Sequence, residues 1–373
     1  MQRKSRMSIL LLSVLMLGAL VVSGRRLQAK EDADGDEYNK KGNILISDQF
    51  NNRVIEIDKR GDIVWSFGLG PADFSPLSII GVNDSQRVDN KTLMAGTGNP
   101  GGFGDCNPGP CPDNRVVLVN RRGLIRWQYG QFGVTGAGPD ELNTPVQATW
   151  LPSGHVLITD QANERVIEVT HDKQIAWQYG ITGGCAPMNS LADNCLNNPN
   201  SAELLENGHI LIADENNNRA IEVNRTNHVV ASFTAAGTAS GVAFASRLAN
   251  GNTLITDSGN ARIVEVDEDD VPVWACFTNT DTLSNPSPLP TRAIRLRNGR
   301  TIISDQFNHR VYEVDHAMPC KIVKSYGLPL NVGNNTGYGT TNANQGMNGP
   351  YDAKVNGDYT GLTPPHARSE DDR

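Results

Sequence analysis

Short apolar runs separated by polar turns recur along most of the chain. Asn43–Ser47 is mainly β-branched and apolar, Arg53–Ile57 follows after an Asp/Asn turn, and Asp62–Phe67 follows after a turn that contains glycine. Runs of this length, bounded by turn-forming residues, are typical of β-strands. A further short apolar segment, such as Pro145–Leu151, precedes each unit. The pattern therefore predicts repeated units of four strands each.

A polar signature marks the turn between the second and third strands of each unit. The pattern Asp-x-x-Asn-x-Arg-x-x-Glu occurs five times, and a sixth unit is degenerate, with Gly96 in place of the Asp and Leu118 in place of the Glu. The anchor positions 48, 96, 160, 214, 257 and 305 are 43 to 64 residues apart. Such a period indicates a propeller, solenoid or array. Four short strands per unit favour an all-β, six-bladed β-propeller. The repeated acidic and basic positions are Asp48 and Arg53, Asp160 and Arg165, Asp214 and Arg219, Asp257 and Arg262, and Asp305 and Arg310.

The two ends of the repeat predict how the ring closes. Blade one begins at Gly42 with its second strand, because no innermost strand precedes it. Pro350–Gly357 resembles Pro290–Gly299, which opens blade six. We therefore expect Tyr351–Val355 to supply the innermost strand of blade one, beside Ile44–Ser47, because closure removes an open sheet edge. The expected divisions are a signal peptide at 1–24, an acidic segment at 25–41, the propeller at 42–357 and a disordered tail at 358–373.

The first residues have the composition of a secretory signal peptide. Arg3, Lys4 and Arg6 precede the apolar run Met7–Val22, and small residues follow, ending at Gly24. A basic start, an apolar core and a small-residue exit are typical of such signals. The apolar run is short for a membrane span. We expect cleavage after Gly24 and a secreted protein without a stable membrane span; the alternative is a protein anchored by an uncleaved segment.

The charge of the chain argues against two classes of partner. The 373 residues carry a formal net charge of −8, and the sequence pI is near 5.4. Nucleic-acid-binding proteins and proteins with a basic membrane-binding patch have the opposite balance. We therefore expect no nucleic-acid partner.

Secretion favours disulfide bonds between cysteines. Cys106 and Cys111 bracket a short Asn-Pro-Gly-Pro segment, and Cys185 and Cys195 bracket another insertion, so each pair is expected to form a local disulfide. Cys276 is expected to be a small buried apolar residue. Cys320 begins an outer strand of the next blade, and because outer strands diverge from the axis we do not expect these two to pair. No spacing typical of a zinc site occurs. The Asn-x-Ser/Thr sequons, which are expected glycan acceptors, lie at Asn83, Asn90, Asn224 and Asn334.

The long insertions are predicted to lie on one face of the ring. Strands alternate in direction, so the turn after the second strand of a blade and the connection to the next blade open on the same face, here called the loop face; the opposite one is the hairpin face. Loops on a rigid scaffold commonly carry function, so the loop face is the first place to expect a site. The insertions are Thr97–Asn114, Gln131–Thr144, Ile181–Asn198, Thr278–Pro290 and Leu328–Asn348.

The motif resembles a known repeat family. Leu157-Ile-Thr-Asp-x-x-Asn-x-Arg-Val-x-Glu-Val169, followed by a turn and an aromatic strand, resembles the NHL repeat, and the resemblance covers 42–327. The Glu of the second motif strand and the Trp of the next are also similar to repeats of arylsulfotransferase-type propellers. The resemblance implies a six-bladed propeller, a fold that serves many unrelated tasks.

The repeated Asp, Asn and Arg are interpreted as structural, because a catalytic site need occur only once in a ring. Asp can bind the N–H groups of the turn, and Arg can bridge to a carboxylate or carbonyl of the adjoining blade. One-off residues are better site candidates. One position of the predicted innermost strands varies, beside a position that is mostly alanine. It is expected near the channel mouth on the loop face, as a ligand site or, alternatively, as blade-to-blade packing. Its residues are Ser78, Gln147, Ser201, Phe244, Arg292 and Asp352.

Three functional classes fit the predicted fold. The first, which we favour, is a scaffold that binds protein or glycan through the loop face, without catalytic residues or a cofactor. The second is an arylsulfotransferase-like enzyme, which would need a nucleophilic His at the channel, whereas the histidines of this chain lie outside the predicted innermost strands. The third is a metal-dependent lactonase or lyase, which stoichiometric calcium or zinc would favour and for which Asp352, Gln147 and Glu203 are the available axial ligands.

Overall fold

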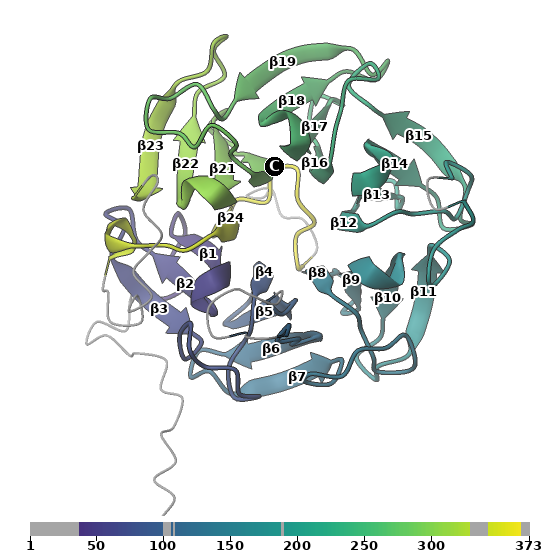
Figure 1. Cartoon of the computed structure of the whole chain (residues 1–373), viewed down its shortest axis with the longest axis vertical. Coiled ribbons are helices and arrows are strands. Elements are labelled where there is room, and N and C mark those ends of the chain that lie inside the picture. The colour runs from purple at the N-terminus through teal and green to yellow at the C-terminus, as the bar shows by residue number, and fades with distance from the viewer. Residues whose placement is uncertain (1–36, 100–105, 107–108, 188–189, 329–341, 367–373) are drawn as a thin grey trace, which may run out of the picture.

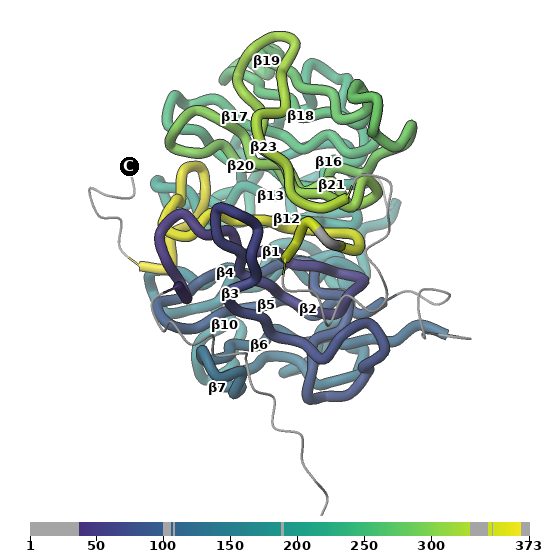
Figure 2. Tube along the Cα trace, turned by 90° about the vertical axis from the view of Figure 1, so that its left-hand side faces the viewer, coloured from purple at the N-terminus to yellow at the C-terminus, as the bar shows by residue number. Residues whose placement is uncertain are grey.

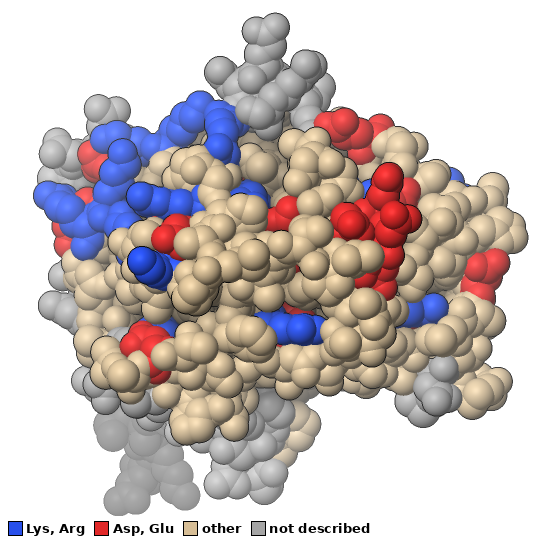
Figure 3. Space-filling model, turned by 90° about the horizontal axis from the view of Figure 1, so that it is seen from above, with Lys and Arg blue, Asp and Glu red and all other residues tan. Residues whose placement is uncertain are grey.

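The computed structural model describes residues 37–99, 106, 109–187, 190–328 and 342–366. Six four-stranded antiparallel sheets stand in a ring (Figure 1), which confirms the six-bladed β-propeller. Seen edge-on, the ring is a thick disc in which Lys and Arg gather toward the upper left and Asp and Glu toward the right (Figure 3). Within the described ranges, no helix is long and apolar enough to cross a membrane. The expected signal peptide and the sequon at Asn334 lie outside these ranges.

From the axis outward, the blades contain the following strands. Blade one has β24 (Pro350–Val355), β1 (Ile44–Asp48), β2 (Arg53–Ile57) and β3 (Ile63–Phe67). Blade two has β4 (Val82–Val88), β5 (Lys91–Gly96), β6 (Arg115–Asn120) and β7 (Ile125–Tyr129). Blade three has β8 (Pro145–Trp150), β9 (Val156–Asp160), β10 (Arg165–Val169) and β11 (Ile175–Tyr179). Blade four has β12 (Pro199–Leu204), β13 (Ile210–Asp214), β14 (Arg219–Val223) and β15 (Val229–Phe233).

Blade five has β16 (Val242–Arg247), β17 (Thr253–Asp257), β18 (Arg262–Val266) and β19 (Pro272–Phe277). Blade six has β20 (Pro290–Arg295), β21 (Thr301–Asp305), β22 (Arg310–Val314) and β23 (Ile322–Gly327). Short 3₁₀ turns follow the second strand of five blades, and one more precedes β24. They are η1 (Gln49–Asn51), η2 (Gln161–Asn163), η3 (Glu215–Asn217), η4 (Ser258–Asn260), η5 (Gln306–Asn308) and η7 (Ala343–Gln345).

The repeated Asp and Arg shape the turn at the loop face. In blade three, Asp160 Oδ2 accepts hydrogen bonds from Asn163 Nδ2 at 2.7 Å and from Arg165 Nε at 2.8 Å. Arg165 Nη1 also donates to the carbonyl of Ala137, in the connection from blade two. The guanidinium thus ties the turn to that connection. Of the two expected partners, the carbonyl is found, in the connection from the adjoining blade, whereas the carboxylate that Arg165 binds is the Asp of its own repeat. The same pairing occurs in Arg53–Asp48, Arg219–Asp214 and Arg262–Asp257.

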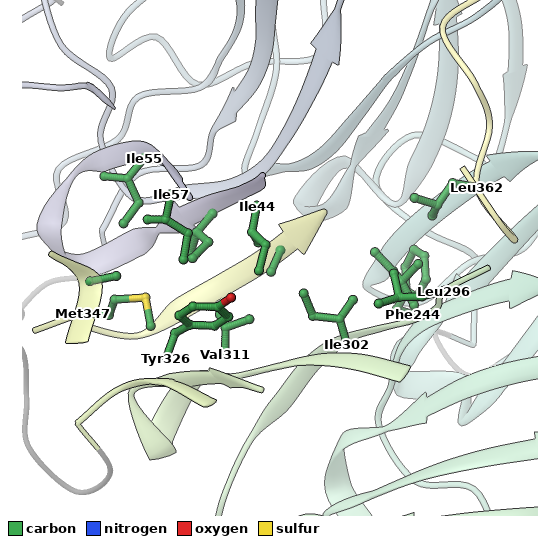
Figure 4. Packing of buried hydrophobic residues seen from close by; sticks show 14 residues of the cluster. Ile44, Ile55, Ile57, Phe244, Leu296, Ile302, Val311, Tyr326, Met347 and Leu362 are labelled. Atoms are coloured by element: carbon green, nitrogen blue, oxygen red, sulfur yellow. The ribbon is translucent and has the colours of Figure 1, made fainter. Parts of the chain in front are cut away.

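β24 closes the ring as expected. It pairs antiparallel with β1, with Ala353 opposite Ile46 and Val355 opposite Ile44. Figure 2 shows the yellow C-terminal segment beside the purple N-terminal strand. Figure 4 shows Ile57 of blade one and Tyr326 of blade six on either side of β24, within one buried apolar cluster. Because apolar burial is the main favourable term in folding, this cluster holds the first and last blades together.

The segment after β24 does not form the expected loose tail over its described part. Leu362 is buried in the same apolar cluster. Thr363 donates from its N–H at 2.8 Å and from its hydroxyl at 2.6 Å to Glu203 Oε2 in blade four. Gln86 Nε2 of blade two donates to the Thr363 carbonyl. Residues 358–366 therefore lie across the hairpin-face end of the channel.

Three disulfides are present. Cys106–Cys111 and Cys185–Cys195 are the expected local bridges, each with a Cα–Cα distance of 5.6 Å. Cys276–Cys320 also forms, with a Cα–Cα distance of 5.5 Å, so the expectation that these two remain apart is wrong. The hairpin between β22 and β23 folds against the outermost strand of blade five, where Trp274 Nε1 donates to the carbonyl of Ala317. Strand twist brings neighbouring blades together at the rim.

Candidate functional site

The predicted variable position lies inside the channel and not at an open mouth. Gln147, Ser201, Phe244, Arg292 and Asp352 occupy one register on their innermost strands and are each 1% exposed or less.

Ser78 is not part of this set. It lies in the connection between β3 and β4, where its hydroxyl accepts a hydrogen bond from the N–H of Leu69. Asp84 of β4, opposite Ala95, takes its place, and Ser85 occupies the neighbouring position that is mostly alanine in the other blades.

Several side chains of this column join neighbouring blades. Gln147 Oε1 accepts a hydrogen bond from the N–H of Ala202 in the next blade at 2.7 Å. Asp84 Oδ2 accepts from the N–H of Ala148, and Asp352 Oδ2 accepts from the N–H of Ser85. These N–H groups lie on the inner edges of the sheets, where no further strand can bind them. The residues at this variable position therefore form contacts between blades, which was the alternative to a ligand site.

A buried charge network crosses the axis. Lys354 Nζ lies 2.6 Å from Asp84 Oδ1 and 2.6 Å from Asp352 Oδ2. Arg292 forms longer ion pairs with the same two carboxylates, at 3.6 and 3.4 Å, and its guanidinium carbon lies 4.7 Å from the ring centre of Phe244. Burial raises the pKa of Asp352. Burial alone would lower the pKa of Lys354, but Asp352 and Asp84 raise it, and the net direction is upward.

The channel is closed at both ends. Toward the loop face, the Tyr351 hydroxyl and the Asn200 side-chain amide exchange hydrogen bonds of 2.9 and 3.1 Å across the axis. At the hairpin face, Thr363 covers Glu203. The space left beneath Thr363 is about 20 Å³, which is room for a single water molecule. A ligand that approaches the axis from the loop face therefore meets the residues above Tyr351.

Those residues were missed by the sequence reasoning. Each directly follows the anchor position of its repeat, and together they are called the axial ring: Gln49, Thr97, Gln161, Glu215, Ser258 and Gln306. In five blades the side chain donates a hydrogen bond to the next blade. The acceptors, in chain order, are Asn83 Oδ1, the Pro145 carbonyl, Glu215 Oε2, the Pro290 carbonyl and Gln49 Oε1. The sequence contained one signal for them, because the position directly after the repeated Asp differs from unit to unit.

Glu215 is the exception in the axial ring. Its Oε2 accepts hydrogen bonds from Asn200 Nδ2 at 2.8 Å, Asn198 Nδ2 at 3.1 Å and Gln161 Nε2 at 3.4 Å. Its Oε1 accepts none from the described residues, and no basic side chain within those ranges forms an ion pair with it. Burial raises the pKa of Glu215, because the three amides only partly replace water. The ring is therefore interrupted at blade four by a carboxyl group with one unbonded oxygen.

The sequons differ in their accessibility. Asn83 is 4% exposed and accepts a hydrogen bond from Gln49, so the expectation of a glycan at Asn83 is wrong for the folded chain. Asn90 is exposed in the turn between β4 and β5. Asn224 is partly buried and its Oδ1 accepts from the Thr226 hydroxyl. Glycosylation at Asn90 and Asn224 stays a prediction.

His155 and His209 lie away from the axial charge network, whereas His366 belongs to the segment that crosses the hairpin-face end of the channel. His155 and His209 bond the repeat carboxylates Glu168 and Glu222, at 2.7 and 2.6 Å, near the starts of β9 and β13. His309, in the turn before β22, accepts a hydrogen bond from the N–H of Gly349. Among the described residues, no group of three or more His, Cys, Asp or Glu is arranged to hold a metal ion. A hollow of about 370 Å³ lies near the rim, between the Cys276–Cys320 disulfide and Arg310.

Comparison with known proteins agrees with the fold. No protein-family model matches the sequence, and no curated protein matches it. A protein of unknown function from Bacteroides caccae is similar in structure, with a TM-score of 0.54 and 15% identity over 78% of this chain and 94% of that one. A catalytically inactive variant of virginiamycin B lyase from Staphylococcus aureus, solved with quinupristin, has a TM-score of 0.50 and 13% identity, over 82% of this chain and 88% of that one. At these identities the likeness shows the propeller fold.

Proposed function

We propose that this chain is a secreted, NHL-like propeller that binds a glycan or protein ligand at the loop-face end of its axis. The observation that carries the proposal is the axial ring, where a position that varies between otherwise repeated residues links five of the six blades to the next one around the axis. Repeated residues maintain the scaffold in every blade, whereas a ligand site needs a different side chain on each side of the ligand. The axial ring has that property.

The chemistry of the ring suits a polar ligand. Gln161 and Thr97 are only partly buried and offer an amide and a hydroxyl. Gln49, Ser258 and Gln306 are buried, and their bonds to the next blade hold the ring in place. Amide and hydroxyl groups match the hydroxyls of a glycan or the amides of a peptide. The described parts of the long insertions open on the same face and would enlarge the contact.

A secreted location is supported by two independent features. The N-terminal sequence has the composition of a signal peptide. The three disulfides are consistent with an oxidising compartment. Mass spectrometry of the protein from culture medium would test this, with the mature N-terminus expected at Arg25; retention in the membrane fraction would instead support the anchored alternative.

Binding can be tested with purified full-length protein on an array of neutral oligosaccharides and peptides. For a probe that binds, Gln161→Ala and Thr97→Ala should each weaken affinity about fivefold, the loss of roughly one hydrogen bond. Gln174→Ala makes the same chemical change at an exposed turn of blade three and should leave affinity unchanged. Equal affinity for all four proteins, or no bound probe, would contradict the proposal.

The same assay separates binding from the enzyme alternative. The structurally similar lyase acts as an enzyme, so each bound probe should also be recovered after incubation and its molecular mass measured by mass spectrometry. A probe recovered with unchanged mass supports a binding role, and a changed mass supports catalysis. Parallel samples with calcium and with a chelator measure whether calcium contributes.

A further inference from the structure

The loop face differs from the rest of the chain in charge. The connections and insertions on this face contain Asp and Glu but no Lys, Arg or His. Within the described residues they are 69–81, 97–99, 106, 109–114, 131–144, 181–187, 190–198, 234–241, 278–290, 328 and 342–349. Basic residues occur instead in turns of the hairpin face, such as Lys59, Arg60 and Arg121. An anionic ligand would find few partners on the loop face, whereas a cationic one would be attracted to it.

Several acids of these loops already have a basic partner. The pairs are Asp140–Lys173, Asp193–His228 and Asp281–Arg310, with distances of 2.8, 2.9 and 2.8 Å. The repeat Arg residues on this face are likewise held in ion pairs with Asp. Glu215 has no such partner in the described structure, although it lies in the axial ring.

We propose that the ligand of the axial ring presents a protonated amine to Glu215. This inference rests on the proposed function and names the chemistry of the ligand. Glu215 is partly exposed, and its carboxylate has no counter-charge among the described residues, so a ligand that reaches it with an ammonium group would supply that charge. Oε2 is already held by three amide donors, so the amine donates to the unbonded Oε1. Charge-assisted hydrogen bonds of this kind are stronger than those between neutral groups.

None of the described side chains that bond to Glu215 carries a positive charge. Asn198 and Asn200 of its own blade and Gln161 of blade three are neutral. Glu164 of blade three accepts a hydrogen bond from the N–H of Asn198, which adds negative charge nearby.

The charged and titratable groups below Glu215 are engaged with one another. Burial, together with the charge of Glu215, raises the pKa of Tyr351 to about 12, so the phenol is neutral. Arg292, deeper in the channel, forms ion pairs with Asp352 and Asp84. Asp214, directly before Glu215, pairs with Arg219.

Two sources could present the amine, a free amino sugar of a glycan or a lysine side chain of a protein. Four probes distinguish them: a glucosamine tetramer, its fully N-acetylated counterpart, a Gly-Ser-Lys-Ser-Gly peptide, and the same peptide with acetyl-lysine and a blocked N-terminus. The lysine peptide is also blocked at its N-terminus, so that each pair differs only in amine charge. Binding is measured by calorimetry with the full chain at neutral pH.

The expected result is that at least one amine probe binds about tenfold or more tightly than its acetylated partner, as a charge-assisted hydrogen bond would give. Glu215→Gln should remove this preference and leave the acetylated probe nearly unchanged. Glu268→Gln, at an exposed turn of blade five, is the matched control and should retain the preference. The glycan pair and the peptide pair are compared separately, which shows whether the protein recognises the amine of an amino sugar or that of a lysine.

Failure of this inference can be separated from failure of the proposed function. If acetylated probes bind as tightly as amine probes, and Gln161→Ala weakens both, the axial ring binds ligands but the amine assignment is wrong. An amine preference that survives Glu215→Gln also overturns the assignment. If no probe binds, both proposals fail. The comparison of amine and acetylated probes on the unmodified protein remains decisive even if Glu215→Gln folds poorly.

Discussion

At the scale of single residues, blade six shows what the repeated Asp–Arg pair does in the other blades. Asp305 is fully buried, but Arg310 Nη1 bonds to Asp281 in an insertion, at 2.8 Å. Asp305 keeps hydrogen bonds from Asn308 Nδ2 at 2.7 Å and from the N–H of Leu289 at 3.2 Å. Burial is the largest effect and raises the pKa of Asp305 to about 6, against the lowering effects of Asn308 and Arg310.

This predicts a pH dependence of stability that comes from Asp305. Because its pKa is raised in the folded state, the folded protein holds the proton more tightly than the unfolded chain, and the stabilisation is complete below about pH 4. It is lost as pH rises through about 6. Asp305→Asn should remove this loss, so the free energy of unfolding of the wild type relative to the variant should fall by about 2 kcal/mol from pH 4 to pH 7. Urea unfolding at several pH values measures it, with the exposed Asp269→Asn as control. Parallel pH curves for wild type and Asp305→Asn would refute it.

At the scale of strands and turns, local sequence was sufficient for most of the ring. β-Branched second strands and the Asp-x-x-Asn-x-Arg turn placed five blades, because both signals are local. Blade two was misaligned: β4 (Val82–Val88) is largely polar, and it was not recognised as an innermost strand whose side chains bind neighbouring blades. The Cys276–Cys320 pair was missed because the two cysteines approach each other through the twist of two separate blades, which the sequence of neither strand predicts.

The axial ring was missed for a related reason. A variable position beside a repeated Asp is usually a solvent-exposed turn residue, and only the ring geometry brings the copies together. The sequence therefore showed which residues are structural, such as Asp160 and Arg165. It did not show that Glu215 meets Gln161 across a blade boundary.

The Cys276–Cys320 disulfide should contribute more to stability than Cys106–Cys111. Their sequence separations are 44 and 5 residues, and loop-closure entropy predicts about 4 and about 2 kcal/mol. Cys276→Ala with Cys320→Ala should therefore lower the melting temperature more than Cys106→Ala with Cys111→Ala. Thermal unfolding of both double variants under non-reducing conditions tests this. An equal or reversed order would show that joining blades five and six at the rim adds little.

At the scale of the whole molecule, the ring encloses a channel that its own chain closes. Tyr351 and Asn200 close the loop-face end, and Thr363 covers Glu203 at the hairpin-face end. Between them, Lys354, with Asp84 and Asp352, joins blades one and two by charge. The interior is therefore part of the scaffold, and ligands are expected at the axial ring above it.

Two truncations separate the roles of β24 and of the segment that follows it. Ending the chain after Asn348 removes β24, exposes the edge of β1, leaves Asp84 without Lys354 and opens the apolar cluster between blades one and six. We expect this chain to lose cooperative unfolding, because a buried charge without its partner alone costs about 3 to 5 kcal/mol. Ending the chain after Gly357 keeps β24 and removes contacts such as those of Asp358, Tyr359, Leu362 and Thr363, at a cost of about 2 to 4 kcal/mol. The second chain should therefore melt cooperatively at a modestly lower temperature. Calorimetry and limited proteolysis of both chains make the comparison, and if the chain ending at Asn348 melts like the chain ending at Gly357, β24 does not hold the ring closed.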